Sequence, residues 1–201
     1  MDHMAPKLEV IKSAIENQLN DEQRASLFQV VTHVEVKLAL FSLGRNKTPG
    51  LDGHPVEFFI ESWEVVGGLL TEGVLNFFQH NKLLNEVSNI VITLAPKVIN
   101  ATSQMDYRFI SCCNVIYKCI SKIMANRVVS VLPALISREQ SAFVPSRCIA
   151  DNVLLAHELV HAYQSQKGPS HYALKVDLMK AFDSVEWNFL HPVLNAFDFL
   201  E

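Results

Sequence analysis

The sequence predicts a mixed α+β fold, and two observations support this prediction. Apolar residues recur every three or four positions over most of residues 8–84 and 114–166, which is the spacing of one face of an α-helix. Between these regions, "NIVITLAPKV" (89–98) and "MDYRFISC" (105–112) are rich in β-branched and aromatic residues. A polar segment joins them, as in an antiparallel hairpin. With 201 residues, 49% of them apolar, the chain can bury a sizeable core.

The N-terminal region is expected to hold two helices followed by a long loop. Helical spacing runs over residues 8–43, and the polar stretch Asn20-Asp21-Glu22 separates the two helices. The next segment, "GRNKTPGLDGHP" (44–55), contains three glycines and two prolines. This composition predicts a turn-rich loop, with turns at Pro49-Gly50 and Asp52-Gly53.

Three further helices are predicted on the two sides of the hairpin, over residues 56–84, 114–132 and 149–166. Gly67-Gly68 is expected to interrupt the first of them. The second should expose its lysines and bury Ile116, Ile120 and Ile123. The third should bury a stripe that consists of Ile149, Val153, Ala156, Val160 and Tyr163.

The C-terminal part is expected to form a strand and then a helix. The segment "HYALKVDL" (171–178) has the β-branched and aromatic content of a strand. The segment "SVEWNFLHPVL" (184–194) begins a helix that is expected to continue to the end of the chain.

Net charge is −4, but the charges are unevenly distributed. Residues 1–96 carry 7 basic and 12 acidic side chains, residues 97–147 carry 7 and 2, and residues 148–201 carry 3 and 7. The basic middle predicts either contact with phosphates or a solvated positive face. No apolar run approaches the roughly 18 residues of a membrane span, and no secretory signal is visible. The four cysteines are spaced as buried or free thiols rather than as a disulfide framework.

One short motif suggests a different function. "HELVH" (157–161) matches the zinc-protease pattern H-E-x-x-H, in which His157 and His161 bind the metal and Glu158 is the general base. Such a site needs a third ligand. Where the extended pattern has Gly and His, this chain has Gln164 and Lys167. We therefore interpret the motif as a chance match beside the apolar stripe of a helix, with a metalloprotease as the alternative.

The stronger chemical signal is "YALKVDLMKAFDSVEW" (172–187). A predicted strand delivers Asp177, and a carboxylate at the end of a buried strand is costly unless something binds it. Mg²⁺ favours such hard oxygen ligands. Asp183 would lie roughly 20 Å away if the strand continued, so the two carboxylates can share a metal only if the chain bends sharply. Taken alone, Asp177 is half of a metal site, or else a helix cap or a surface acid.

Four segments, in this order, resemble the reverse transcriptases of non-LTR (LINE-type) retrotransposons, plant elements above all. They are "NKTPGLDGHPVEFF", "TLAPKVINATSQMDYRFISCCNVIYKCISKIMANRV", "EQSAFVPSRCIADNVLLAHELV" and "ALKVDLMKAFDSVEW". The last contains the first palm motif of that family, V-D-L-x-K-A-[FY]-D. The resemblance implies an incomplete right-hand polymerase fold, with fingers helices, a fingers β-hairpin, and the first palm strand and helix.

In the palm, the resemblance implies a metal-dependent catalytic site. Asp177 matches the first metal-binding, catalytic aspartate, and the backbone carbonyl of Leu178 is expected to be a further ligand. The expected metal is Mg²⁺, with Mn²⁺ as an alternative. Phe182 matches the aromatic steric gate, whose ring occupies the place of a ribose 2′-hydroxyl and so selects deoxynucleotides. Asp183 is assigned a structural role in closing the turn.

In the fingers, the resemblance implies contacts with nucleotide and template. Lys97 and Arg108 match the two hairpin cations that hold the triphosphate, where a point charge and a bidentate fork suit a polyanion. Two unconnected surface cations are the alternative. The loop residues Arg45, Asn46 and Lys47 are expected near the template strand. Further template or nucleotide contacts are expected from Gln140, Ser141, Phe143, Arg147 and Asn152.

The chain also departs from the family pattern. Phe109 stands where the family has Pro after the hairpin arginine, and Ala95 stands where it often has Ile. Pro145-Ser146 replaces a Lys-Gly pair before Arg147.

The resemblance divides the chain into a helical lead-in (1–43), a fingers region (44–170) and the start of the palm (171–201), which stops before the second aspartate motif. It implies an RNA-directed DNA polymerase fragment, a nucleotidyltransferase that uses an RNA template, a DNA primer and dNTPs. We expect this fragment to be inactive by itself, and its parent to be intracellular and nuclear. The alternative is a non-catalytic nucleic-acid-binding remnant of the same element. No oligomeric state follows from the sequence.

Overall fold

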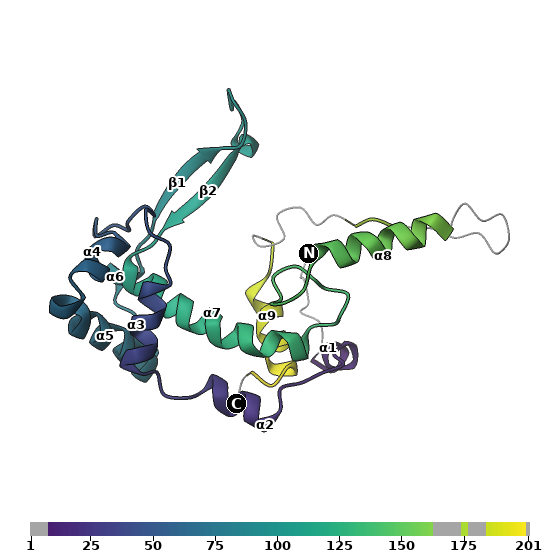
Figure 1. The fold of residues 1–201 in the computed structure, drawn as a ribbon, viewed down its shortest axis with the longest axis horizontal. Coiled ribbons are helices and arrows are strands. Elements are labelled where there is room, and N and C mark those ends of the chain that lie inside the picture. Colours follow the sequence, from purple (N-terminus) through teal and green to yellow (C-terminus); the bar gives the residue numbers. More distant parts are fainter. Residues whose placement is uncertain (1–7, 163–173, 177–183, 200–201) are drawn as a thin grey trace. The chain divides into compact units, whose positions relative to one another are not determined.

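The computed structural model describes residues 8–162, 174–176 and 184–199. It shows helices and one two-stranded antiparallel hairpin, so the predicted α+β class is confirmed (Figure 1). In chain order the elements are α1 Leu8–Ala14, α2 Asp21–Leu27, α3 His33–Phe41, α4 Val56–Glu61, α5 Trp63–His80, α6 Asn85–Ser88, β1 Val91–Pro96, η1 Gln104–Asp106, β2 Tyr107–Cys112, α7 Val115–Leu135, α8 Ile149–Ala162 and α9 Trp187–Ala196.

The chain forms two compact units. One consists of residues 29–127 and holds α3 to α6, the hairpin and the first part of α7. The other consists of residues 1–28 and 128–201. We call them the central unit and the terminal unit. This division follows packing, and the predicted boundary between fingers and palm stays a prediction.

The N-terminal region contains three helices rather than the predicted two. The predicted break is present, because Asn20 caps α2 and its side chain accepts a hydrogen bond from the Gln23 N–H at 2.8 Å. A second break separates α2 from α3, where the Thr32 hydroxyl accepts from the Glu35 N–H at 3.2 Å. Thr is a favoured N-cap because its oxygen pairs with a donor that the new helix leaves unsatisfied. The sequence pattern over residues 8–43 predicts the break at Asn20 but not the second break at Thr32.

Residues 56–84 form two helices, and the break is not at the glycines. It lies at Ser62, between α4 and α5. Helix α5 continues through Gly67-Gly68. Gly67 is a packing position, since the absence of a side chain there lets the Trp63 ring lie against the helix. A Cβ at Gly67 would lie 2.7 Å from the indole. The helix ends at Asn81, whose φ of 53° is a left-handed conformation that Asn tolerates at helix ends.

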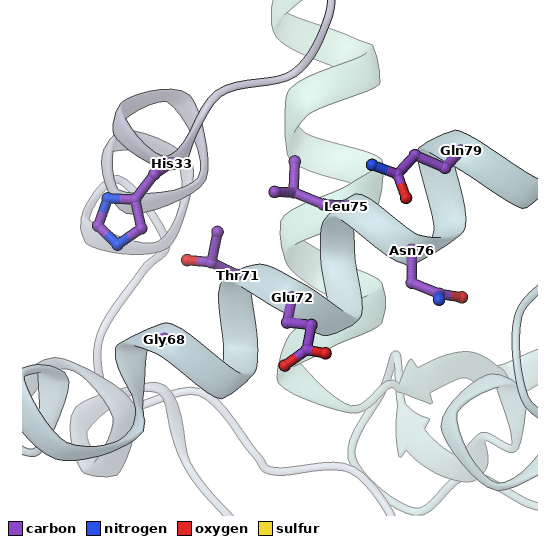
Figure 2. A pocket seen from close by; sticks show the side chains of 7 residues that line it. All are labelled: His33, Gly68, Thr71, Glu72, Leu75, Asn76 and Gln79. Atoms are coloured by element: carbon purple, nitrogen blue, oxygen red, sulfur yellow. The ribbon is translucent and has the colours of Figure 1, made fainter.

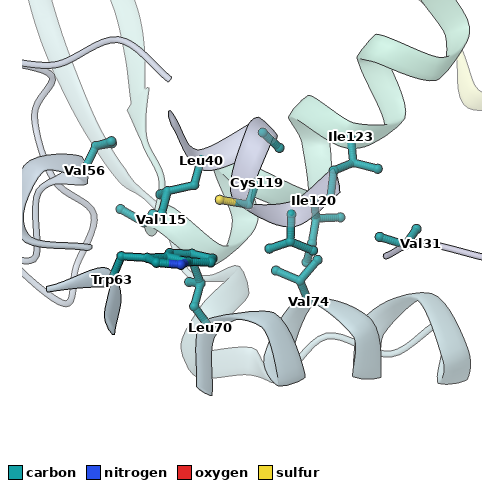
Figure 3. Close-up of a cluster of buried hydrophobic side chains, with 12 residues drawn as sticks. Val31, Leu40, Val56, Trp63, Leu70, Val74, Val115, Cys119, Ile120 and Ile123 are labelled. Carbon is teal, nitrogen blue, oxygen red and sulfur yellow. The ribbon is translucent and has the colours of Figure 1, made fainter. Parts of the chain in front are cut away.

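The core of the central unit lies between α3, α4, α5 and α7 (Figure 3). Its buried residues are Val31, Val36, Ala39, Leu40, Val56, Trp63, Leu70, Val74, Val115, Cys119, Ile120 and Ile123. The predicted inner face of α7 is thus confirmed for Ile120 and Ile123, and Ile116 packs against the same cluster. Arg127 fixes α7 to α3 through a bidentate pair with Glu35, with both nitrogen–oxygen distances at 2.8 Å. Bidentate pairs of this kind are stronger and more directional than simple ion pairs.

The hairpin agrees with the prediction in position and direction. Strand β1 pairs antiparallel with β2, from Val91 opposite Cys112 to Pro96 opposite Tyr107. Figure 1 shows the two strands running side by side away from α4 and α6.

The terminal unit has a smaller core of Leu19, Val131 and Leu135, against which the aromatic end of α9 packs. Helix α9 does not run to the chain end as predicted. It stops at Phe197, where the Asp198 N–H bonds to the Asn195 carbonyl and the Phe199 N–H to the Leu194 carbonyl. With Asp198 at φ 62°, this is a Schellman cap, which closes a helix by pairing its last carbonyls.

One predicted element near the C-terminus differs from the structure, and another lies mostly outside the described residues. Helix α8 forms, but Ile149, Val153 and Val160 of its predicted buried stripe are 59–65% exposed. Of the predicted strand over residues 171–178, only Leu174 to Val176 are described, and they form no strand. A strand needs a hydrogen-bonded neighbour, and the strands that the structure describes pair only with each other.

No helix in the described ranges has both the length and the apolar character that crossing a bilayer requires. All four cysteines are free thiols, as their spacing predicted.

Candidate nucleic-acid interface

The hairpin register determines which side chains share a face. The Lys97 N–H donates to the Asp106 carbonyl at 2.7 Å, so the pairing continues one step beyond Pro96. Side chains that lie opposite each other in a hairpin project from the same face, and successive residues alternate. Arg108 is opposite Ala95, two residues before Lys97. Lys97 and Arg108 are therefore diagonal neighbours on one face, with Cα atoms about 7–8 Å apart for such pairs.

Lys97 is held by the turn of the hairpin. Its ammonium donates to the Met105 carbonyl at 2.8 Å, which leaves two of its three donors available. The Asp106 carboxylate accepts the Ser103 N–H at 2.9 Å and the Thr102 N–H at 3.1 Å. These two hydrogen bonds and, to a smaller extent, the nearby Lys97 ammonium lower the pKa of Asp106. A carboxylate thus fixes the turn beside Lys97.

Arg108 is exposed, and no described residue forms a hydrogen bond or an ion pair with its guanidinium. Its neighbour Phe109, which replaces the family's proline, is 67% exposed and lies on the opposite face with Leu94. The ladder continues through Phe109 without a bulge, with Arg108 opposite Ala95. One face of the hairpin therefore carries Lys97 and Arg108, with Asp106 opposite Lys97, and the other carries Leu94 and Phe109.

The loop 44–55 lies against the base of the same hairpin. Its three predicted template-binding residues, Arg45, Asn46 and Lys47, are all exposed. Asn46 has a φ of 56°, and its N–H donates to the carboxylate of Glu57 at the start of α4. That hydrogen bond lowers the pKa of Glu57, with smaller contributions from the N–H of Glu57 itself and from Arg45.

Asn114 is the residue at this interface that the sequence reasoning missed. It is 5% exposed, and its side-chain oxygen accepts the Asp52 N–H of the loop at 3.4 Å. Its side-chain nitrogen donates to the Glu86 and Val87 carbonyls at 3.1 and 3.4 Å. The sequence did contain a signal, since Asn directly before a helical pattern predicts an N-cap. The signal did not indicate that this side chain would bond to two distant segments.

Lys118 also holds the loop. Its ammonium donates to the Thr48 carbonyl at 3.0 Å. The sequence placed this lysine on the outer face of its helix, and it is in fact half-buried there.

Gln140, Arg147 and Asn152, which were also predicted to contact template or nucleotide, lie in the terminal unit and form hydrogen bonds within it. The Arg147 guanidinium donates to four backbone carbonyls after and within the last turn of α7, those of Pro133, Ile136, Ser137 and Gln140. The Gln140 amide donates to the Ala142 carbonyl at 3.3 Å. The Asn152 amide donates to the Glu139 carbonyl at 2.8 Å and to the Ser141 hydroxyl at 3.0 Å. These contacts organise the loop between α7 and α8, and the predicted roles in template binding stay predictions.

The predicted palm residues Asp177, Leu178, Phe182 and Asp183 lie outside the described residues. Within the described ranges, no group of three His, Cys, Asp or Glu side chains gathers as a metal site would require. The two histidines of HELVH are exposed on α8.

A cavity of about 430 Å³ in the central unit lies between α3 and α5 (Figure 2). Polar side chains in its lining are His33 on α3 and Glu72, Asn76 and Gln79 on α5. Figure 2 shows Thr71 on the side of α5 that faces His33. Thr71 is 5% exposed, and its hydroxyl oxygen is buried without a hydrogen-bond partner. Such a group costs free energy that a well-placed partner would recover.

Comparison with known proteins relates the chain to one family and to two transposon proteins. Residues 99–201 match the family described as reverse transcriptase (RNA-dependent DNA polymerase). Over 181 residues, the chain is 32% identical to the Transposon TX1 uncharacterized 149 kDa protein of Xenopus laevis, which is 90% of this chain and 14% of the relative. Over 177 residues, it is 24% identical to the Retrovirus-related Pol polyprotein from type-2 retrotransposable element R2DM of Drosophila melanogaster. That match covers 88% of this chain and 16% of the relative. The chain therefore spans a small part of the length of these two proteins.

Proposed function

The chain belongs to the reverse transcriptase family, and we propose that its hairpin and loop 44–55 bind the incoming nucleotide and the RNA template of an RNA-directed DNA polymerase. It is part of the reverse transcriptase domain of a non-LTR retrotransposon. The closer resemblance to plant elements stays a prediction.

The observation that carries the proposal is the shared face of Lys97 and Arg108. A dNTP brings several negative charges on its phosphates, and an ammonium beside a guanidinium fork can hold them from one side. Both cations are exposed, so neither must break a buried contact to reach a ligand. Charge that develops on the leaving pyrophosphate would be stabilised by the same two groups.

The proposed template surface is the exposed tripeptide of the loop. Arg45 and Lys47 can contact phosphates, and the Asn46 amide can hydrogen-bond to a base or a sugar. The loop and the hairpin belong to one unit and meet at Asn114, so template and nucleotide would be held by neighbouring segments.

The proposed metal ligands are the Asp177 carboxylate and the Leu178 carbonyl, assigned from the family motif. Both are hard oxygen donors, as Mg²⁺ prefers. When bound, the metal would orient the primer 3′-oxygen and neutralise phosphate charge. Phe182 would exclude a ribose 2′-hydroxyl from the same place.

Binding of dCTP to the 201-residue chain, measured by isothermal titration calorimetry, tests the proposal. Lys97→Ala and Arg108→Ala should each weaken binding about tenfold, the value of one lost charge-assisted hydrogen bond. Lys82→Ala is the matched control, since it removes an equally exposed lysine outside the hairpin. dCMP should bind much more weakly than dCTP because it lacks the two outer phosphates.

Equal affinity in the native chain and in both hairpin variants would overturn the nucleotide assignment. If RNA bound in a salt-sensitive way while dCTP did not bind at all, the chain would be a nucleic-acid-binding remnant instead.

A further inference from the structure

The base of the hairpin contains one buried amide that joins three segments. The Asn114 side chain bonds to Asp52 in the loop 44–55, and to Glu86 and Val87 in the short helix α6 that precedes β1. Its own backbone follows β2 by two residues and begins α7, because the Lys118 N–H donates to the Asn114 carbonyl at 3.1 Å. The Asn114 side chain thus joins the loop to the helix before β1, and the Asn114 backbone continues from β2.

The loop approaches Asn114 so closely that only glycine fits at residue 50. A Cβ there would lie 2.0 Å from the Asn114 side-chain oxygen, 2.4 Å from its backbone nitrogen and 2.6 Å from the Cys113 carbonyl carbon. The contact is between backbone segments, and it leaves no space for the loop to shift toward the helix. Lys118 adds a second attachment four residues further along α7.

The chemistry of this junction requires an amide. Asp52 presents a donor, whereas Glu86 and Val87 present acceptors, so the buried side chain must accept at one atom and donate at another. Aspartate has the same shape but only accepts, and it would place a carboxylate against two carbonyl oxygens. Leucine could make none of the three hydrogen bonds.

We infer that Asn114 is a positioning residue that couples the loop 44–55 to the hairpin, so that RNA bound by the loop strengthens nucleotide binding by the hairpin. This inference rests on the proposed function. RNA that orders the loop would also order the hairpin base through the shared amide. The hairpin would then lose less conformational freedom when it binds a triphosphate, and two sites joined in this way bind cooperatively.

The test measures the dissociation constant of dCTP with and without a saturating 12-nucleotide oligouridylate RNA. Cytosine does not pair with uracil, so direct base pairing cannot produce the coupling. In the native chain, RNA should tighten dCTP binding about fivefold or more, the lower end of usual coupling between sites. In Asn114→Asp the ratio should fall to about one, while each ligand alone binds within about threefold of its native affinity.

Two further variants separate positioning from stability. Val74→Ala shortens a fully buried core side chain of the same unit that takes part in none of the junction's hydrogen bonds, so it should destabilise the unit while the ratio stays native. Lys118→Ala releases the loop without leaving a buried polar group unpaired, and should lower the ratio in a stable protein.

A native ratio of one, or an unchanged ratio in both Asn114→Asp and Lys118→Ala, would overturn the inference and leave the proposed function intact. If Lys97→Ala and Arg108→Ala do not weaken dCTP binding, the proposed function fails first. Amide hydrogen exchange then tests, independently of ligand binding, whether Asn114 couples the loop to the hairpin base. If it does, Asn114→Asp must accelerate exchange in both segments together. Faster exchange in only one of them would refute the coupling.

Discussion

Replacing Gly50 by alanine tests the tightest contact of the interface. The added Cβ would lie 2.0 Å from the Asn114 oxygen and 2.4 Å from its nitrogen, whereas real Cβ atoms essentially never come within 3.0 Å of another atom. The loop must therefore retreat by about 1 Å, and what it meets is mostly backbone. Overpacking of this kind costs about 1–3 kcal/mol. Loss of the Asp52 N–H bond to Asn114 adds about 0.5–1 kcal/mol.

We therefore expect Gly50→Ala to lower the free energy of unfolding by about 2–4 kcal/mol. Gly68→Ala is the matched control, since no atom lies within 4 Å of its added Cβ and the residue is exposed in the interior of α5. This change should raise the free energy of unfolding by about 0.5–1 kcal/mol, because alanine favours helix over glycine. The same chemical change thus has opposite signs at the two glycines.

Tryptophan fluorescence during urea unfolding measures both effects. Trp63 is 7% exposed in the core of the central unit, whereas Trp187 is 83% exposed and gives a nearly constant background. With a slope of about 2 kcal/mol per molar urea, the Gly50→Ala midpoint should fall by about 1–2 M. A midpoint within about 0.3 M of the native one would show that the loop does not pack on Asn114 as described.

The remaining predictions concern single groups. Thr71→Val should raise the free energy of unfolding by about 1 kcal/mol in the same urea assay, because it removes a buried hydroxyl without a partner; a loss of stability would mean that the hydroxyl is paired. Ser146→Gly should raise it by about 1 kcal/mol, since Ser146 has a φ of 63° and follows proline in a turn closed by the Arg147 N–H; an unchanged midpoint would contradict this. The pKa of Asp106 is lower in the folded state than in the unfolded state. The stability that its carboxylate adds to the turn is therefore complete above the unfolded pKa of about 3.9, and it is lost as pH falls through the folded pKa. The protection of the hairpin-turn amides, taken relative to the intrinsic exchange rate at each pH, should fall in acid in the native chain, and Asp106→Asn should abolish this change in protection. Burial raises the pKa of Cys119 to about 12, whereas Cys148 is exposed, so a thiol reagent at pH 8 should modify Cys148 first and Cys119 only after unfolding.

The hairpin could be predicted from sequence because its signals are local, whereas the roles of Lys97 and Arg108 come from the family resemblance and stay predictions. Two β-rich segments joined by a short polar turn pair with each other, and the register then places Lys97 and Arg108 on one face. The helices were also predicted, but their ends were less accurate. Ser62 and Thr32 mark breaks that apolar spacing alone does not show, and Gly67 is a packing site for Trp63 rather than a break.

The contacts that organise the interface could not be predicted, because each joins residues far apart in the chain. Asn114 bonds to a loop 62 residues earlier, and Arg127 pairs with Glu35 across 92 residues. A polar side chain on a helix looks the same in sequence whether it faces water or a distant carbonyl. The apolar stripe of α8 shows the opposite case. Its spacing predicts burial, but it does not indicate which segment would cover it, and in the structure the stripe is exposed.

Arg147 shows how a charge predicted to bind nucleic acid can have a structural use. All four of its terminal N–H groups donate to carbonyls, that of Pro133 in the last turn of α7 and those of Ile136, Ser137 and Gln140 after it. Only its Nε–H is not used in these bonds. A phosphate contact by the rest of the guanidinium would therefore expose carbonyls that now have a partner. Arg108 has no such cost, because it is exposed and no described residue pairs with it. The number of donors already used thus distinguishes a cation available for a ligand from one that holds the fold, and on this measure the hairpin is the better candidate for phosphate binding.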